Sequence, residues 1–271
     1  MSRLTESNLK RYNKEGFLAP IDAISFEDAE TLKAHYYKVK QNSSVDIDSI
    51  LRSKPHLVFP WLYDLVKNPA ITDPVSSILG PNLLAWGSSF FAKSANKPGF
   101  VSWHQDANYW GLKPHNILTA WIAFTPSFRE NGCMRVIPCT HTVGALEHQD
   151  TFTKNNLLTR GQEISVSVDE HQAKDIELSP GQMSLHHVSI IHGSDPNTSS
   201  IDRIGFAIRY ISTNVKQNDG RTSATLAKGF DDYDNFDLEP RPEGELDLQS
   251  QRYRRNALKR QHDILFKGAD G

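Results

Sequence analysis

The chain has 271 residues, and its 30 basic and 32 acidic side chains give a formal net charge of -2 at pH 7. This near balance provides no broad electrostatic attraction to nucleic acid or to an anionic membrane surface. No apolar run approaches the roughly 18 residues that a membrane-spanning helix needs, and the segment 1–16 is too polar for a secretory signal. We therefore expect a cytoplasmic protein that binds neither nucleic acid nor membrane and acts on a small molecule.

Helical patterns dominate about the first 80 residues. The predicted helices cover residues 5–15, about 25–41, 57–66 and 71–79. The first of them can be capped by Thr5 and ended by Gly16. Residues 42–56 are polar and are expected to be irregular. Pro69 and Pro74 are expected to interrupt the later helical segments.

Between Leu83 and about Val215 the pattern changes to short apolar or alternating runs that are separated by Gly, Pro and Asn. These runs cover residues 83–94, 100–106, 117–125, 132–140, 163–168, 174–193 and 203–212. Seven or eight strands of this kind fit a jelly roll. We therefore predict a mainly β fold with flanking α-helices.

After Val215 the strand signal fades, and a link rich in proline and acidic residues leads to a basic helix at about 249–266. One basic helix on a nearly neutral chain usually forms a solvated face or packs in a dimer, so it does not indicate nucleic-acid binding. A homodimer stays open at this point. We predict one domain over residues 1–271, made of a helical part (about 1–80), a jelly-roll core (about 83–215) and a C-terminal extension (about 216–271).

The two cysteines, Cys133 and Cys139, lie six residues apart in one predicted strand region. On a regular strand they would share a face and lie too far apart to form a disulfide. We expect two free thiols in a reducing compartment, where they serve as small core residues.

Three residues of the strand-rich region have the types and spacing of an iron site with two histidines and one carboxylate. His104 and Asp106 form an HxD pair, and both side chains would share one face of a strand because strand side chains alternate. His192 precedes a cluster of turn formers and would come from a different strand. Such a triad leaves coordination positions open for oxygen and a co-substrate. His186 has the strand parity of His192 and is the rival ligand if a bulge shifts the register.

An arginine eleven residues after His192 suits a co-substrate. Oxygen activation at such an iron needs a two-electron donor, commonly 2-oxoglutarate, whose far carboxylate is held well by a planar guanidinium group. We assign this role to Arg203. Arg209 has the same strand parity, and it is either a competitor for the role or an ordinary surface residue.

The motifs WHQD at 103–106, NGCMRVIP at 131–138 and HGSDPN at 192–197, followed by Arg203, resemble the phytanoyl-CoA dioxygenase family of iron and 2-oxoglutarate oxygenases. The resemblance extends roughly over residues 9–212. It implies a double-stranded β-helix (jelly-roll, cupin-like) core.

The resemblance also implies roles for particular residues. Fe(II) would be held by His104, Asp106 and His192, and 2-oxoglutarate by Arg203. In similar proteins, the residues that match Ser194 and Trp121 lie against the co-substrate. Related halogenases have a small residue in place of Asp106, so the carboxylate favours hydroxylation.

Residues near the metal motif are candidates for substrate binding. Ser89, Phe91 and Lys93 alternate on the predicted strand before the HxD pair and could all point into the barrel. A buried lysine there would need an anionic partner, such as a phosphonate, phosphate or carboxylate of the substrate. Lys93 could equally lie solvated at the mouth. Three further candidates would lie on a loop over the open face of the metal: Asn108, Tyr109 and Trp110.

We expect an enzyme that uses Fe(II), 2-oxoglutarate and O2 to hydroxylate an unactivated C–H bond of a small polar, anionic molecule, with formation of succinate and CO2. The run WHQDANYWGL, together with the neighbouring motifs, resembles a bacterial branch that includes hydroxylases of 2-aminoethylphosphonate. That compound is the first candidate substrate, and another small metabolite or natural-product intermediate is the alternative. A non-oxidative, cupin-like metal-binding protein is the alternative class, and it would have no need for Arg203.

Overall fold

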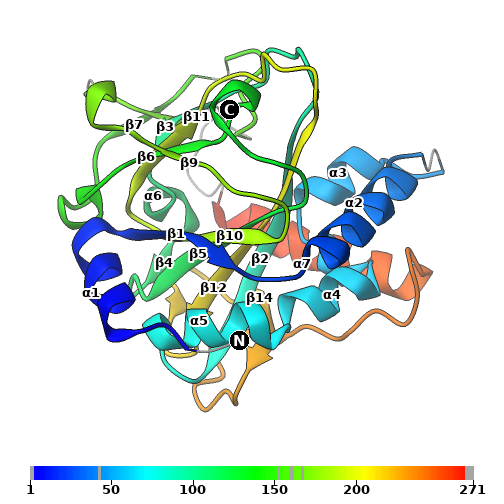
Figure 1. Ribbon diagram of the computed structural model, residues 1–271. Coiled ribbons are helices and arrows are strands. Elements are labelled where there is room, and N and C mark those ends of the chain that lie inside the picture. The colour runs from blue at the N-terminus through cyan, green and yellow to red at the C-terminus, as the bar shows by residue number, and fades with distance from the viewer. Residues whose placement is uncertain (1–2, 42–43, 152, 159–161, 166–167, 266–271) are drawn as a thin grey trace.

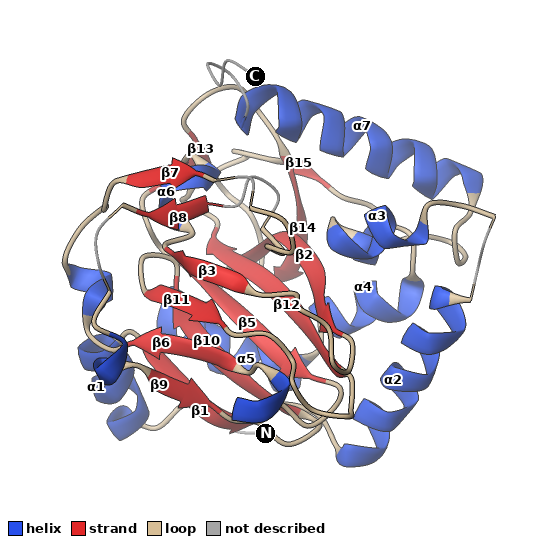
Figure 2. Ribbon diagram, turned by 90° about the horizontal axis from the view of Figure 1, so that it is seen from above, coloured by secondary structure: helices blue, strands red, loops and turns tan. Residues whose placement is uncertain are grey.

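Two facing β-sheets form the centre of the computed structural model, which describes residues 3–41, 44–151, 153–158, 162–165 and 168–265. The larger sheet has the order β1-β10-β5-β12-β2-β14-β15, and the smaller has the order β3-β11-β6-β9. Figures 1 and 2 together show the smaller sheet lying over the larger one. This arrangement agrees with the predicted jelly roll and with the predicted mainly β fold.

The larger sheet consists of β1 (Phe17–Asp22), β2 (Leu83–Lys93), β5 (Ile117–Ala123), β10 (Gln182–His187), β12 (Arg203–Ser212), β14 (Ser223–Lys228) and β15 (Asp237–Leu238). The smaller sheet consists of β3 (Val101–His104), β6 (Met134–Ile137), β9 (Lys174–Ile176) and β11 (Ile191–Ser194). Two short ribbons pair β4 (Leu112–Lys113) with β13 (Lys216–Gln217) and β7 (His148–Asp150) with β8 (Gln162–Ile164).

The helices are α1 (Glu6–Glu15), α2 (Phe26–Lys40), α3 (Ile47–Arg52), α4 (Pro60–Val66), α5 (Pro69–Leu79), α6 (Ala107–Trp110) and α7 (Leu248–Leu265). Helices α2, α3, α4 and α7 gather on one side of the sheets (Figure 1). Short 3-10 turns cover Pro55–Leu57, Arg129–Asn131, Thr140–Thr142 and Glu170–Gln172. No helix of the described ranges is long and apolar enough to cross a lipid bilayer.

The alternation of side chains on β12 separates the core from the site. Ile204, Phe206, Ile208 and Tyr210 point to one face and join a buried apolar cluster with residues of α2, α4 and α5. The Tyr210 hydroxyl also donates to the carbonyl of Val66 at the end of α4, at 2.7 Å. The other face of the strand turns toward a cavity that is lined by Arg203, Ala207 and Arg209. Burial of the first face therefore fixes which side chains line the site.

Local signals predicted the first two helices correctly. The Thr5 side chain accepts from the backbone N–H of Asn8, and Gly16 ends α1 with φ 83°. The Ser25 side chain caps α2 in the same way, by accepting from the N–H of Asp28 at 3.0 Å. The predicted basic helix at the C-terminal end is confirmed as α7 over the residues that the structure describes.

Other predictions about local structure were wrong. Residues 42–56 contain α3, and α5 continues through Pro74. The strands β1 and β14 lie in segments for which no strand was predicted, and they pair with β10 and β2. Both segments lack a long alternating run, so their strand character depends on partners far away in the sequence.

The two cysteines are free thiols, as expected, but they do not share a strand. Cys133 is buried and precedes β6, and Cys139 is exposed and follows it with φ 67°. The strand between them is only four residues long. The prediction of a common strand face was therefore wrong, and so was the prediction of a core position for Cys139.

Candidate metal centre and surrounding pocket

The three residues of the predicted iron site lie together. The ligand atoms of His104, Asp106 and His192 all lie within 4.8 Å of one another, and the described ranges contain no other such group of His, Cys, Asp and Glu side chains. His104 ends β3, and His192 lies opposite it on β11. Asp106 had been expected on the same strand as His104. It instead directly precedes α6 and has a helical backbone conformation. The turn after His104 therefore brings the carboxylate back to the histidines.

Backbone hydrogen bonds orient both histidines. Nδ1 of His104 lies 2.9 Å from the carbonyl oxygen of Ser102, and Nδ1 of His192 lies 3.1 Å from that of Ile190. A carbonyl can only accept, so each Nδ1 carries the proton and donates it. Each Nε2 is then left with a lone pair for a metal ion.

The protonation states also suit a metal centre. Burial is the main cause that lowers the pKa of His192, to about 3, so its ring is neutral near pH 7. Burial acts to raise the pKa of Asp106, but the interactions with His104, His192 and Arg209 outweigh burial, and the pKa lies below its usual range. Two imidazole nitrogens and one carboxylate match the donor set of a non-haem Fe(II) site.

The rival ligand His186 lies beside the triad without joining it. Its ring centroid is 5.1 Å from that of His192, and it lines the same cavity from β10. Burial lowers its pKa to about 4, and its Nδ1 has no hydrogen-bond partner among the described residues. The geometry favours His192 over His186, as the sequence had.

Arg203 is a buried cation that has no counter-charge among the described residues. Its side chain is only 2% exposed, yet no carboxylate of the described residues lies within 4 Å of it. Nη1 donates to the carbonyl of Gly132 at 2.8 Å, while Nε is buried and has no partner in the described part of the chain. Burial lowers its pKa to about 10, so the group stays charged. An unpaired buried guanidinium is costly, and an anionic ligand would remove that cost.

Lys93 is a second basic side chain at this end of the pocket. It lies opposite Arg203 on the neighbouring strand β2 and is 2% exposed, so the alternative of a solvated lysine at the mouth was wrong. Its Nζ donates to the hydroxyl of Ser194 at 2.6 Å and to the carbonyl of Asp195. Burial and the charge of Arg203 lower the pKa of Lys93 to about 6. Ser194 lines the cavity, whereas Lys93 supports it from behind.

Two glycines allow close packing around Arg203 and Lys93 because they lack a Cβ atom. A Cβ at Gly205 would lie 1.8 Å from the Trp121 ring, so the indole lies across the backbone of β12. The Arg203 guanidinium carbon is 5.2 Å from the centroid of that ring. A Cβ added at Gly132, which has φ 73°, would lie 2.3 Å from the carbonyl oxygen of Asp195. The sequence singled out the motif around Gly132 but gave no signal for the contact between Gly205 and Trp121.

The cavity between the two sheets has a volume of about 870 Å³ and extends from the triad to α3. Of the predicted substrate residues, Ser89, Phe91 and Trp110 line it. Asn108 and Tyr109 lie in α6, not in the expected loop, and their side chains are outside the part that the structure describes. The lining residues that sequence reasoning missed include Arg52 and Ser53 at the end of α3, Thr119, Met134 and Asn156.

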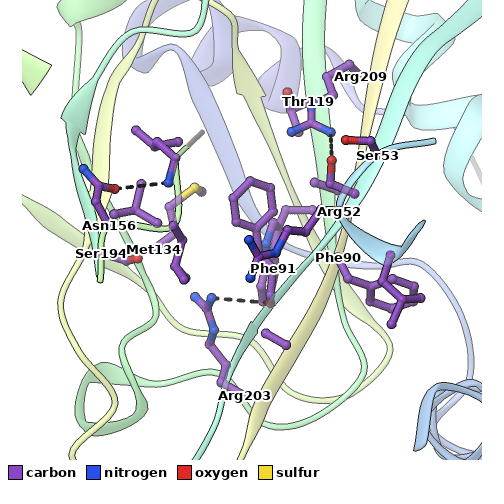
Figure 3. A pocket seen from close by; sticks show the side chains of 18 of the residues that line it. Arg52, Ser53, Phe90, Phe91, Thr119, Met134, Asn156, Ser194, Arg203 and Arg209 are labelled. Carbon is purple, nitrogen blue, oxygen red and sulfur yellow. Dashed lines mark hydrogen bonds between the residues drawn. The ribbon is translucent and has the colours of Figure 1, made fainter. Parts of the chain in front are cut away.

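Arg209 also lines this cavity, and Figure 3 shows it at the opposite end of the group of side chains from Arg203. Nη1 of Arg209 donates to the Ser89 hydroxyl at 2.5 Å. The guanidinium carbon lies 5.7 Å from the ring centroids of both Phe91 and Trp110. The alternative of an ordinary surface arginine was therefore wrong, since Arg209 lies inside the pocket.

Comparisons with known proteins agree with this geometry. A probable alpha-ketoglutarate-dependent hypophosphite dioxygenase of Stutzerimonas stutzeri is 30% identical over 162 residues, which cover 58% of this chain and 54% of that protein. A probable phytanoyl-CoA dioxygenase of Caenorhabditis elegans is 27% identical over 179 residues, which cover 62% of this chain and 57% of the relative. The chain therefore spans little more than half the length of these curated relatives.

A solved structure resembles the whole chain more closely. The apo form of ThoJ, described as a non-heme monooxygenase, is 33% identical, with a TM-score of 0.85 and coverage of 96% of this chain and 97% of that one. The model of the family described as Phytanoyl-CoA dioxygenase (PhyH) matches residues 12–205. Because this match covers more than half of the sequence, the chain belongs to the phytanoyl-CoA dioxygenase family, as the motifs had predicted.

Proposed function

We propose that the chain is an Fe(II)- and 2-oxoglutarate-dependent dioxygenase that hydroxylates a small polar, anionic molecule. The observation that carries this proposal is one pocket that holds both a His-Asp-His triad and the unpaired buried cation Arg203. A metal-binding protein without a co-substrate would have no use for a buried arginine whose Nε lacks a partner. The triad alone would fit either class of protein.

Each residue has a defined role in this proposal. His104, Asp106 and His192 would hold Fe(II), which supplies the redox chemistry that couples oxidative decarboxylation of 2-oxoglutarate to hydroxylation of the substrate. Arg203 would bind the far carboxylate of 2-oxoglutarate. Ser194 is positioned by Lys93 to donate a further hydrogen bond to the co-substrate.

The walls of the pocket would orient the substrate and limit the access of water. Trp121 and Met134 lie near the Arg203 end, and Phe91 and Trp110 lie near the Arg209 end. A substrate carbon held against the triad by such walls gains from proximity and fixed orientation. Family membership and the hypophosphite dioxygenase among the relatives support the class of reaction and an anionic substrate.

We propose 2-aminoethylphosphonate as the first substrate to test, since it is small, polar and anionic. The test is succinate formation from 2-oxoglutarate in the presence of Fe(II) and O2, with and without this compound. We expect the compound to stimulate succinate formation by the wild-type protein and not by Arg203→Gln. Absence of stimulation, with Fe(II) and 2-oxoglutarate still bound, would exclude this substrate. Absence of Fe(II) and 2-oxoglutarate binding would exclude the proposed class.

A further inference from the structure

The pocket contains a second cation, to which the proposed binding of 2-oxoglutarate by Arg203 assigns no role. Arg209 makes one hydrogen bond among the described residues, from Nη1 to the Ser89 hydroxyl, although a guanidinium group has five N–H donors. No carboxylate of the described ranges lies within 4 Å of it. Unlike Nε of Arg203, none of its nitrogen atoms is both buried and without a partner. Its remaining donors are therefore open to the pocket.

Aromatic rings fix the orientation of this cation. The rings of Phe91 and Trp110 both lie 5.7 Å from the guanidinium carbon of Arg209. Contacts of this kind stabilise a guanidinium group and restrict its rotation. A restrained planar group with free donors is suited to bind a phosphonate, phosphate or carboxylate through two parallel hydrogen bonds. Beside α3, the cavity is lined by Arg52 and Lys40 and also by Asp46 and Asp48, so this end carries charges of both signs.

The two arginines of β12 lie at opposite ends of the pocket (Figure 3). Arg203 and Arg209 point to the same face but are six residues apart, which places their Cα atoms roughly 20 Å apart on a strand. Asp106 is the acidic group whose charge acts on Arg209. A metal ion at the triad would take up the charge of that carboxylate and leave Arg209 without a counter-charge.

We infer that Arg209, together with Ser89, binds the anionic group of the primary substrate, at the end of the pocket opposite Arg203. This inference rests on the proposed function for the identity of the co-substrate. It assigns the substrate to small molecules that carry a phosphonate, phosphate or carboxylate group. It also replaces Lys93 as the predicted anion-binding residue, since Lys93 lies behind Ser194 beside Arg203.

Calorimetric binding without turnover tests the inference. The protein is first titrated with Ni²⁺, as a metal that does not support the reaction, and with 2-oxoglutarate. The probes are then 2-aminoethylphosphonate, methylphosphonate and inorganic phosphate. The uncharged control is N-(2-hydroxyethyl)acetamide. The wild-type protein is expected to bind at least one of the three anions and to bind the uncharged control more weakly.

The variants separate the two arginines. Arg209→Gln is expected to weaken anion binding at least tenfold and to change 2-oxoglutarate affinity less than twofold, while Arg209→Lys recovers part of the anion binding. Arg203→Gln is expected to weaken 2-oxoglutarate binding at least tenfold and to change anion affinity less than twofold. Arg255→Gln, on an exposed position of α7, is the matched control and is expected to change neither. Melting curves check that each variant is folded.

Two results would overturn the inference: wild-type anion affinity in folded Arg209→Gln, or no anion bound more tightly than the uncharged control by the wild-type protein. Loss of Ni²⁺ and 2-oxoglutarate binding has a different meaning. If the wild-type protein binds the anions through Arg209 but not the metal and 2-oxoglutarate, the oxygenase proposal fails and the anion site stands. The two failures are therefore distinguishable.

Discussion

His104 and His192 lie directly opposite one another on the neighbouring strands β3 and β11, with their ring centroids 4.1 Å apart. Residues directly opposite on antiparallel strands bring their side chains into contact, so the pairing of these strands assembles the two nitrogen ligands. In each case the carbonyl two residues earlier accepts from Nδ1. The backbone of the smaller sheet therefore sets both the position and the tautomer of the histidines before a metal binds.

Removal of one of these rings should abolish the metal site. His192→Ala is expected to lower Fe(II) affinity at least a hundredfold, because only one nitrogen and one carboxylate ligand would remain. His186→Ala is the matched control, since it removes a neighbouring buried imidazole of the same cavity that is not part of the triad. Metal titration of the two apo proteins provides the comparison. Tight binding by His192→Ala and weak binding by His186→Ala would show that His186 is the ligand.

The geometry of Arg203 should matter as much as its charge. Arg203→Lys keeps a positive charge but loses the planar group that can form two parallel hydrogen bonds. Hydrogen bonds to charged groups contribute about 1.5–3 kcal/mol each, so the affinity for 2-oxoglutarate is expected to fall about tenfold or more. Metal affinity is expected to change little, which is measured by titration with Ni²⁺ alone. Unchanged 2-oxoglutarate affinity in Arg203→Lys would contradict the assigned role.

Gly205 should be intolerant of a side chain. A Cβ at this position would overlap the Trp121 ring, so Gly205→Ala must displace the indole from Arg203. Overpacking of this kind costs about 1–3 kcal/mol of stability, and 2-oxoglutarate affinity is expected to fall as well.

Gly87 provides the control for this substitution, because a Cβ there would meet its nearest neighbour, Cδ of Arg209, at an ordinary distance of 3.8 Å. Gly87→Ala is expected to leave 2-oxoglutarate affinity close to that of the wild-type protein. Melting temperature and 2-oxoglutarate titration are measured for both variants. Equal behaviour of the two variants would refute the proposed contact.

A buried ion pair next to the pocket should make stability depend on pH. The carboxylate of Glu239 contacts Lys54 and His56, and all three side chains are buried. Burial acts to raise the pKa of Glu239, but the charge of Lys54 and the hydrogen bond with His56 outweigh it and lower the pKa from 4.5 to about 2. The pair therefore stabilises the fold fully above pH 4.5, and this contribution is lost as the pH falls toward 2.

Glu239→Gln should remove this contribution. The variant leaves Lys54 buried without its partner, so we expect a loss of about 3–5 kcal/mol in the free energy of unfolding at pH 7. The loss should shrink between pH 4.5 and 2. Asp64→Asn, which breaks an exposed ion pair with Arg241, is the control and should cost less than about 1 kcal/mol. Denaturant unfolding across this pH range gives both values, and a loss that does not depend on pH would contradict the account.

Much of the fold could be predicted from local signals in the sequence. The cap at Thr5 and the alternating run of β12 depend on neighbouring residues only, so they appear correctly in both the prediction and the structure. The strands β1 and β14 depend on pairing with β10 and β2, far away along the chain. No local pattern specifies such a partner, and these strands were therefore missed.

In the site as well, some features follow from the local sequence and others from the pairing of distant strands. The identities and spacing of His104, Asp106 and His192 were enough to predict that they would lie together, although the strand geometry assumed for Asp106 was wrong. The closeness of Trp121 to Gly205 and the position of Lys93 behind Ser194 result from the register of neighbouring strands. A single sequence does not reveal that register. The side of the pocket formed by α3 was missed because this helix is only six residues long.

The most direct test of the proposed function is an anaerobic titration of the apo protein with Fe(II) and 2-oxoglutarate, followed by visible absorption. A weak charge-transfer band is expected, because the co-substrate would chelate the iron at the positions that the triad leaves open. The band should be absent in folded His192→Ala and should appear in folded His186→Ala. Absence of the band in the folded wild-type protein, or its full retention in His192→Ala, would contradict the assignment of this pocket as an iron and 2-oxoglutarate site.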